Sequence, residues 1–234
     1  MDFAETEDQK MIRGMVREFA EDVAGPTCNK RDKEQIAPIE EFKKFAELGF
    51  AGMTIPEKYG GQKLDDISEA IVIEELSRVD PSLGVMIAVH VGLCSMTIAL
   101  SGNDEQKEKY LPKLASGEFL GAYSLSEAGS GTDAAAMVAR ATDNGEHYTL
   151  NGEKMWVTNG TTADLFVLFA KVTDHPDYDK KSHGGVTCFI IEKGFEGFEI
   201  GKKEDKLGIR SSDTCTLILN ECKVPKANVL GEVG

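Results

Sequence analysis

The sequence predicts a multidomain α+β protein, in which an N-terminal all-α helical domain precedes an antiparallel β-barrel or β-sandwich domain. In the first half, apolar residues recur every three or four positions, as in amphipathic helices. After Gly117, β-branched and aromatic residues dominate and the apolar period shortens towards two. The expected strands follow one another without intervening helices, which is typical of an antiparallel sheet. We therefore expect a helical domain over residues 1–118 and a β domain over 119–227.

Five helices are expected in the first half. Thr6 with Gln9, and Asn103 with Gln106, have the spacing of helix-starting capping pairs. Gly25-Pro26 is expected to end the first helix. The fourth helix is apolar on almost every face, so we expect other helices to surround it. The expected helices cover, in order, about residues 6–23, 38–48, 66–79, 82–100 and 103–115.

The second half is expected to form short strands separated by turns. Asp143-Asn144-Gly145 and Asn151-Gly152 indicate hairpin turns, because Asn and Gly tolerate positive φ. The charged segment 171–185 is expected to be a solvated loop, and residues 228–234 to begin a linker to a further domain. The expected strands cover residues 120–126, 137–142, 147–150, 153–158, 165–172, 186–192, 197–201 and 214–219.

The charge balance argues against nucleic acid as a partner. The chain has 26 basic and 40 acidic residues, a net charge of −14, whereas binding phosphodiester backbones requires clustered Lys and Arg. A local set of backbone N–H groups can still hold an anionic cofactor. Five widely spaced cysteines with no C-x-x-C pair indicate neither a disulfide framework nor a zinc site, and favour a reducing compartment.

The sequence predicts a cytoplasmic protein without membrane insertion. The N-terminus has no basic and apolar targeting segment. The uncharged run Ser82–Asn103 is close to the length of a membrane span, which needs roughly 20 predominantly apolar residues. It contains glycines, a histidine and several hydroxyl residues, so we interpret it as a buried helix of a soluble protein.

The stretch 121–160 is the candidate site. At one end a strand runs into Gly129-Ser130-Gly131-Thr132, and at the other lies Trp156, the only tryptophan. We expect an intervening hairpin to bring these ends together. Backbone N–H groups, hydroxyls and an aromatic plane suit a ligand with phosphates and a flat ring.

Each of these features also has an alternative explanation. The Gly/Ser run is neither a Walker loop nor a G-x-G-x-x-G motif and could be an ordinary turn. Trp156 could be a core aromatic. Glu127 could act as a general base, although a carboxylate beside a turn is more often a cap or an ion-pair partner. The four histidines lack metal-ligand spacing, and His90 is expected to be a hydrogen-bonded core residue.

Five motifs in order resemble the acyl-CoA dehydrogenase family, and the similarity covers essentially the whole chain. The nearest subgroup is the short-chain, butyryl-CoA type. The motifs lie at residues 102–111, 123–133, 150–160, 201–210 and 224–231.

The resemblance implies an FAD-dependent oxidoreductase of fatty acid metabolism with three domains, the third a four-helix bundle. Such an enzyme oxidises a short- to medium-chain acyl-CoA to the trans-2-enoyl-CoA. A carboxylate removes the α-proton and the β-hydrogen leaves as hydride to flavin N5. Electrons then pass to an electron-transferring flavoprotein. The full-length protein is expected to be a homotetramer.

The resemblance also implies roles for individual residues. Ser126 would hydrogen-bond the flavin pyrimidine edge, Trp156 would pack on the ring, and Thr158 would donate towards N5. Thr132 would also contact CoA. The expected cofactor contacts are Tyr123, Leu125, Ser126, Gly131, Thr132, Trp156, Val157 and Thr158. The expected substrate contacts are Thr132, Ser182 and His183 for CoA, and Leu93 and Met96 for the acyl chain.

The sequence departs from the family pattern at Ala128, where many members carry proline, and at Thr132, where many carry serine. The family's catalytic base is a glutamate of the C-terminal bundle, which has no counterpart in these 234 residues. We therefore expect no catalytic residue in this chain, weak FAD binding, an exposed apolar surface on the helical domain and no activity of the chain alone. Two alternatives are an oxidase or flavin monooxygenase of the same fold, and a non-catalytic subunit that pairs with a separate chain.

Overall fold

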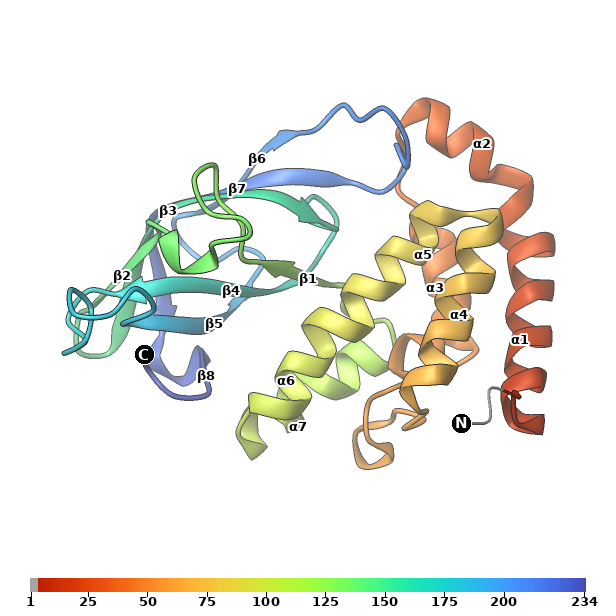
Figure 1. Cartoon of the computed structure of the whole chain (residues 1–234), viewed down its shortest axis with the longest axis horizontal. Helices are drawn as coiled ribbons and strands as arrows, with labels where there is room; N and C mark the ends of the chain where they lie inside the picture. The colour runs from red at the N-terminus through yellow and green to blue at the C-terminus, as the bar shows by residue number, and fades with distance from the viewer. Residues whose placement is uncertain (1–3) are drawn as a thin grey trace.

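The computed structural model describes residues 4–234, which form a helical layer and a sheet layer lying side by side (Figure 1). The helical layer also contains two π-helical turns and short 3₁₀ turns. Its main elements are α1 (Glu7–Phe19), the π turn η1 (Ala20–Ala24), α2 (Gly25–Glu34), α3 (Ile39–Glu47), α4 (Asp66–Val79), α5 (Pro81–Ala88), the π turn η4 (Val89–Ser95), α6 (Met96–Ser101) and α7 (Asp104–Ala115).

The predicted helix starts are confirmed. Thr6 with Gln9 and Asn103 with Gln106 both form reciprocal capping boxes. The predicted stop at Gly25-Pro26 is wrong, because the chain continues through η1 directly into α2. Pro26 lies in the first turn of α2, where an N–H group has no helical partner and its absence costs little.

One continuous helix, formed by α5, η4 and α6, runs between the two layers (Figure 1). Among residues 4–234 it alone is long and apolar enough to cross a membrane by length and composition, with a mean hydropathy of 2.1, and half of its most apolar window is buried. The sequence predicted that other helices surround it on every side, and this prediction is wrong. One side packs against β1 and the neighbouring helices, and Leu93 and Leu100 remain 43% and 75% exposed.

The sheet has eight strands in the order β6-β7-β3-β2-β4-β5-β8, with β1 beside β4. Most pairs are antiparallel, as predicted, but β1 and β2 pair with β4 in parallel along the same edge. The strands are β1 (Gly121–Ser124), β2 (Arg140–Asp143), β3 (His147–Thr158), β4 (Leu165–Val172), β5 (Val186–Glu192), β6 (Phe198–Lys203), β7 (Thr214–Pro225) and β8 (Val229–Leu230).

Strand β3 passes through Asn151-Gly152 without turning, so the second predicted hairpin is wrong. The pairing with β7 shifts between Leu150 and Gly152, and the extra residue lies on β7 near Glu221, whose φ is 53°. Asn151 exchanges two hydrogen bonds with Glu221 across this irregularity. The first predicted turn, at Asn144-Gly145, is confirmed, with Gly145 at a φ of 88°.

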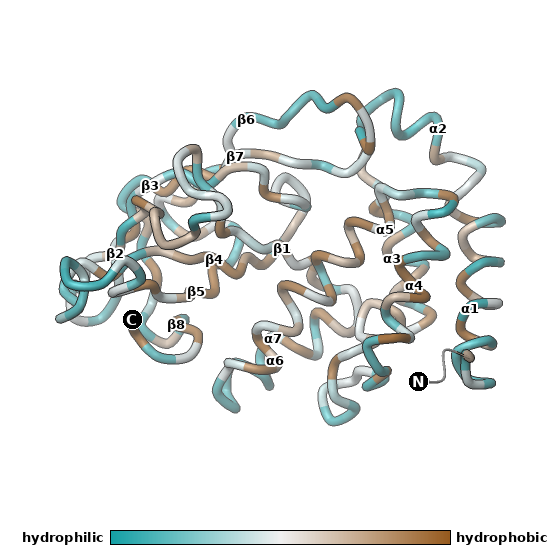
Figure 2. Tube along the Cα trace, in the orientation of Figure 1, coloured by the Kyte–Doolittle hydropathy of each residue, from teal (hydrophilic) through white to brown (hydrophobic). Residues whose placement is uncertain are grey.

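Three apolar clusters stabilise the fold. One lies within the helical layer and one within the sheet. The third, the shared core, joins Cys94, Ile98 and Leu114 to Leu165, Val167 and Ile190. Figure 2 shows hydrophobic residues along the continuous helix and the inner strands, and hydrophilic ones on the outer helices. The two layers therefore share buried apolar surface.

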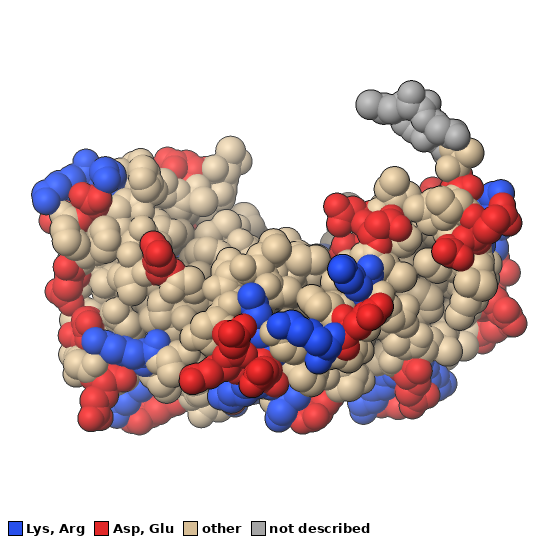
Figure 3. Space-filling model, turned by 90° about the horizontal axis from the view of Figure 1, so that it is seen from below, with Lys and Arg blue, Asp and Glu red and all other residues tan. Residues whose placement is uncertain are grey.

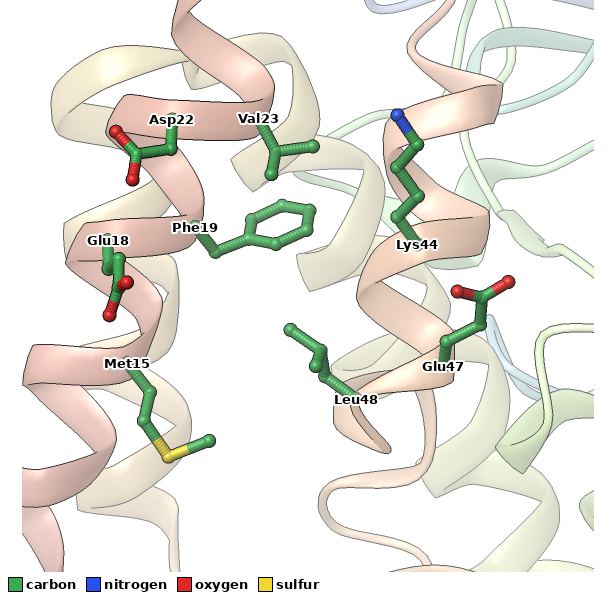
Figure 4. A pocket seen from close by; sticks show the side chains of 8 residues that line it. All are labelled: Met15, Glu18, Phe19, Asp22, Val23, Lys44, Glu47 and Leu48. Carbon is green, nitrogen blue, oxygen red and sulfur yellow. The ribbon is translucent and has the colours of Figure 1, made fainter.

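A groove of about 440 Å³ lies on the outer surface of the helical layer, between α1 with η1 and α3 (Figure 4). Phe19, Val23 and Leu48 form its apolar part. Glu18 and Asp22 line one side of it with carboxylates, and Glu47 and the single lining cation, Lys44, lie on the other side (Figure 4). It is separate from the stretch 121–160.

Candidate cofactor site

The two ends of the stretch 121–160 meet, as the sequence predicted. The Met155 N–H donates to the Ser126 carbonyl at 2.9 Å. The Lys154 ammonium donates to the Leu125 carbonyl at 3.0 Å. The segment that follows β1 therefore lies against β3 immediately before Trp156.

Trp156 is 62% exposed, so the alternative of a core aromatic is wrong. The β3–β7 pairing shifts between Lys154 and Val157, and the extra residue is on β3. Trp156 has a φ of 56° in this bulge. Bulges re-aim side chains relative to a regular strand. Here the indole stays exposed while Val157 and Lys154 on either side are buried.

The glycine loop, residues 127–139, leaves several hydrogen-bonding groups free. Within residues 4–234, the amides of Gly129, Gly131 and Thr132 donate to no protein group. Added Cβ atoms at Gly129 and Gly131 would meet no other atom within 4 Å. The loop continues only into the three-residue 3₁₀ turn Ala134–Ala136 and not into an α-helix. Any attraction for an anion therefore comes from individual amides and not from a helix dipole.

Two hydroxyl residues lie near Trp156 along the backbone, Thr158 two positions further on and Ser126 across the hydrogen bond from Met155. Ser126 and Thr158 are both partly exposed, and neither hydroxyl bonds to any group in the described part of the chain. A free amide set, two free hydroxyls and an exposed indole on one connected segment are suited to a flat heterocycle that carries a diphosphate. At the start of the same segment, the phenol ring of Tyr123 packs against the Phe169 ring, with the two centroids 5.4 Å apart.

Glu127 is a structural carboxylate, in line with the ion-pair alternative. Its side chain is 3% exposed and lies 2.7 Å from the Lys154 ammonium. It also accepts the amide hydrogens of Val138 and Ala139, at 2.6 and 3.1 Å. Burial lowers the pKa of Lys154, and the hydrogen bond to Glu127 opposes this shift. Sequence reasoning did not find that Lys154 is fully buried, because lysine is almost never so unless it is paired.

His90 and Asn159 join the continuous helix to the site. The Gly121 N–H donates to His90 Nδ1 at 3.0 Å, and Nε2 lies 3.1 Å from the Leu114 carbonyl. The Asn159 amide donates to the Gly121 carbonyl at 3.0 Å and to the Met86 carbonyl at 3.1 Å. The expectation of a hydrogen-bonded core histidine is confirmed. Nothing in the sequence around Asn159 indicated its role, which depends on a φ of 65°.

The predicted substrate residues lie in two different places. Leu93 and Met96 belong to the continuous helix, in η4 and α6. Ser182 and His183 are exposed in the loop between β4 and β5, which Figure 1 shows at the outer end of the sheet. No hydrogen bond within the described residues joins Ser182 or His183 to Thr132 or Leu93. Figure 3 shows the molecule hollowed between the two layers, and in this view the hollow is lined mainly by uncharged residues.

A helical layer followed by a mainly antiparallel sheet, with an exposed aromatic and free amides on one connected segment, defines a two-layer protein with a candidate site for a flat cofactor that carries phosphates. Residues 6–118 match the acyl-CoA dehydrogenase N-terminal domain, and residues 122–222 match the acyl-CoA dehydrogenase middle domain. The chain belongs to the acyl-CoA dehydrogenase family.

Individual relatives agree with this assignment. The chain is 44% identical over 234 residues to a short-chain-specific acyl-CoA dehydrogenase of Clostridium acetobutylicum, covering all of this chain and 60% of the relative. It therefore spans about three fifths of that relative's length.

Solved structures are similar over almost the whole chain. Butyryl-CoA dehydrogenase from Megasphaera elsdenii has a TM-score of 0.92 at 39% identity, and the match covers 100% of this chain and 61% of that one. Bacillus anthracis acyl-CoA dehydrogenase complexed with FAD has a TM-score of 0.89 at 38% identity, with 98% and 38% covered. A chain described as the electron transferring flavoprotein of Acidaminococcus fermentans has a TM-score of 0.93 at 45% identity, with 100% and 60% covered.

Proposed function

We propose that this chain forms the FAD-binding part of an acyl-CoA dehydrogenase that converts a short- to medium-chain acyl-CoA into the trans-2-enoyl-CoA. One observation carries the proposal. The Trp156 indole is held exposed, in a left-handed bulge of the strand that carries Thr158 and is hydrogen-bonded to the Ser126 carbonyl, and the hydroxyl groups of both residues are free. A bulky residue in this backbone conformation is strained, and such strain is concentrated at ligand sites.

The residues present fit FAD. Trp156 would pack on the flavin ring, and Ser126 and Thr158 would donate hydrogen bonds to its polar atoms. The free amides of Gly129, Gly131 and Thr132 would contact the diphosphate. When bound, FAD supplies the acceptor for the hydride that leaves the substrate's β-carbon.

The chain's own residues would act by orientation and electrostatics. Donors aimed at the ring stabilise the negative charge that it gains on reduction, and such preorganised donors act strongly where water is excluded. Leu93 and Met96 would provide apolar surface for the acyl chain. The hollow between the layers is largely uncharged in Figure 3, in keeping with an apolar acyl group.

The α-proton needs a separate base. The Glu127 side chain is only 3% exposed and is engaged by Lys154 and two backbone amides, so it is not placed to act on a substrate. We propose that a carboxylate outside these 234 residues takes the proton. We also propose that the complete enzyme is a homo-oligomer that passes electrons to an electron-transferring flavoprotein.

The chain's single tryptophan provides the test. Titration with FAD is expected to quench Trp156 fluorescence, and butyryl-CoA is expected to perturb the absorbance of the bound flavin without bleaching it. No turnover of butyryl-CoA with an artificial acceptor is expected. Unchanged tryptophan fluorescence at saturating FAD would contradict the cofactor assignment, and bleaching by butyryl-CoA would show that the base lies within this chain.

A further inference from the structure

We propose that the buried Lys154–Glu127 ion pair is a positioning pair that holds the two cofactor-contacting segments in register. This inference rests on the proposed FAD site. The segments are Leu125–Ser126, which follow β1, and Met155–Trp156, which belong to the bulge of β3. They are 30 residues apart in sequence, and neither belongs to the other's regular strand pairing.

Lys154 makes the first connection. Its side chain is 0% exposed, and its ammonium group donates to the Leu125 carbonyl at 3.0 Å and to Glu127 at 2.7 Å. One residue further, the Met155 N–H donates to the Ser126 carbonyl. The Lys154 side chain therefore ties the Leu125 backbone and the Glu127 carboxylate, one on each side of Ser126, to β3 two residues before Trp156.

Glu127 makes the second connection. Its carboxylate accepts the amide hydrogens of Val138 and Ala139, and so ties the start of the glycine loop to its end. The Glu127 and Ser130 backbones also exchange hydrogen bonds at 2.8 and 3.1 Å. The loop that carries the free amides is thereby closed by one carboxylate, and that carboxylate is anchored to β3 through Lys154.

Stability alone is a poor explanation for this pair. Removing two charges from water costs about as much as their attraction returns, and an apolar pair of similar size is often equally stable. A buried lysine with two acceptors instead fixes the positions of the two segments that carry those acceptors. Through their hydrogen bonds, Glu127 and Lys154 also connect the glycine loop, the Ser126 segment and the bulge of β3.

The test compares Lys154→Met with the double variant Glu127→Gln/Lys154→Met, which leaves no unpaired buried charge. We expect the FAD dissociation constant to rise at least tenfold in both, even where the double variant melts near the wild-type temperature. Without FAD, the amides of Met155, Val138 and Ala139, which donate to Ser126 and Glu127, are expected to exchange hydrogen at least tenfold faster than in the wild type. Amides of β4 and β5 are expected to exchange at the wild-type rate.

Lys223→Met is the matched control, because Lys223 and Glu196 form an exposed ion pair in the same layer. It is expected to change neither FAD affinity nor exchange. A folded double variant with FAD affinity and loop exchange within twofold of wild type would overturn the inference. Failure of the wild-type chain to bind FAD would overturn the proposed function, whereas unchanged exchange in the variants would overturn the positioning role independently of FAD.

Discussion

His90 is a histidine that the fold keeps neutral. It is fully buried, Gly121 donates a backbone hydrogen bond to Nδ1, and Nε2 therefore carries the proton and donates to Leu114. Burial lowers the pKa of His90 from 6.5 to about 4, against a smaller opposing effect of its backbone hydrogen bonds. Charging this ring would break the bond from Gly121 and place a cation in an apolar site.

We predict that stability falls as the pH is lowered from 6.5 towards 4. Below pH 6.5 His90 becomes protonated in the unfolded chain but stays neutral in the folded chain. The contribution of neutral His90 to the free energy of unfolding is therefore complete above pH 6.5, and it is lost as the pH falls through the folded pKa of about 4. The loss is about 3 kcal/mol. Urea unfolding at pH 7.5 and 4.5 measures it. The variant His90→Gln is expected to lose less over this range, and an equal loss in both proteins would contradict the prediction.

At Trp156 the backbone and the side chain have opposing effects on stability. A left-handed φ of 56° costs a bulky L-residue roughly 1–2 kcal/mol, and the mostly exposed ring recovers little by packing. We predict that Trp156→Gly is more stable than Trp156→Ala by about 1 kcal/mol, the reverse of the usual order in strands. Both variants are expected to bind FAD at least tenfold more weakly. Chemical denaturation gives the first comparison, and flavin titration followed by flavin absorbance gives the second.

Among the elements, β3 depends on a glycine where it passes β2. Gly152 has a φ of 147°, and a Cβ there would lie 2.7 Å from the Ala139 Cβ. We predict that Gly152→Ala destabilises the protein by about 2–4 kcal/mol, through both backbone strain and overpacking. Gly145→Ala is the matched control, because Gly145 also has positive φ but has nothing within 4 Å of the added carbon. It is expected to cost only about 1 kcal/mol, and similar losses in thermal melts of the two variants would refute the packing argument.

The sequence predicted elements well where local signals agreed with packing. β4, β5 and α4 have the predicted bounds, because β4 and β5 are nearly continuous apolar runs between polar or turn residues, and α4 runs from the capping residue Asp65 to Asp80-Pro81. It failed at Gly25-Pro26 and Asn151-Gly152, since glycine, proline and asparagine permit a turn without requiring one. Whether the chain turns at such residues depends on the packing and pairing of the rest of the helix or strand.

In the candidate site, too, features with a local sequence signal were predicted and features that depend on strand pairing were not. The family motifs located the Ser126 segment and Trp156, which the structure brings together. The bulge that exposes Trp156, the burial of Lys154 and the bridge made by Asn159 arise from pairing between β3 and distant elements. No local pattern encodes such pairing, so these features could only be found in three dimensions.

On the scale of the whole molecule, Asn159 is a polar link between the layers. It supplies hydrogens to a carbonyl of α5 and to the first carbonyl of β1. We predict that Asn159→Gly lowers the free energy of unfolding by about 2–3 kcal/mol, because two buried carbonyls lose a donor. Glycine suits the φ of 65°, so backbone strain does not contribute.

Calorimetry tests this link. The variant is expected to show two resolved thermal transitions in place of one, as the helical and sheet layers unfold separately. Asn151→Gly is the control, since the Asn151 side chain bonds only to the exposed Glu221. A single sharp transition with unchanged stability in Asn159→Gly would contradict the role of Asn159 as a link.

The shared core also constrains how this protein is made. Residues from η4, α6 and α7 leave the ribosome well before β4 and β5, whose Leu165, Val167 and Ile190 complete that cluster. Cys94, Ile98 and Leu114 therefore lack their strand partners while roughly 75 further residues are synthesised, which takes several seconds at typical translation rates. During that interval the nascent helical layer presents an apolar face to the cell, and it is at this stage that the chain most needs a chaperone.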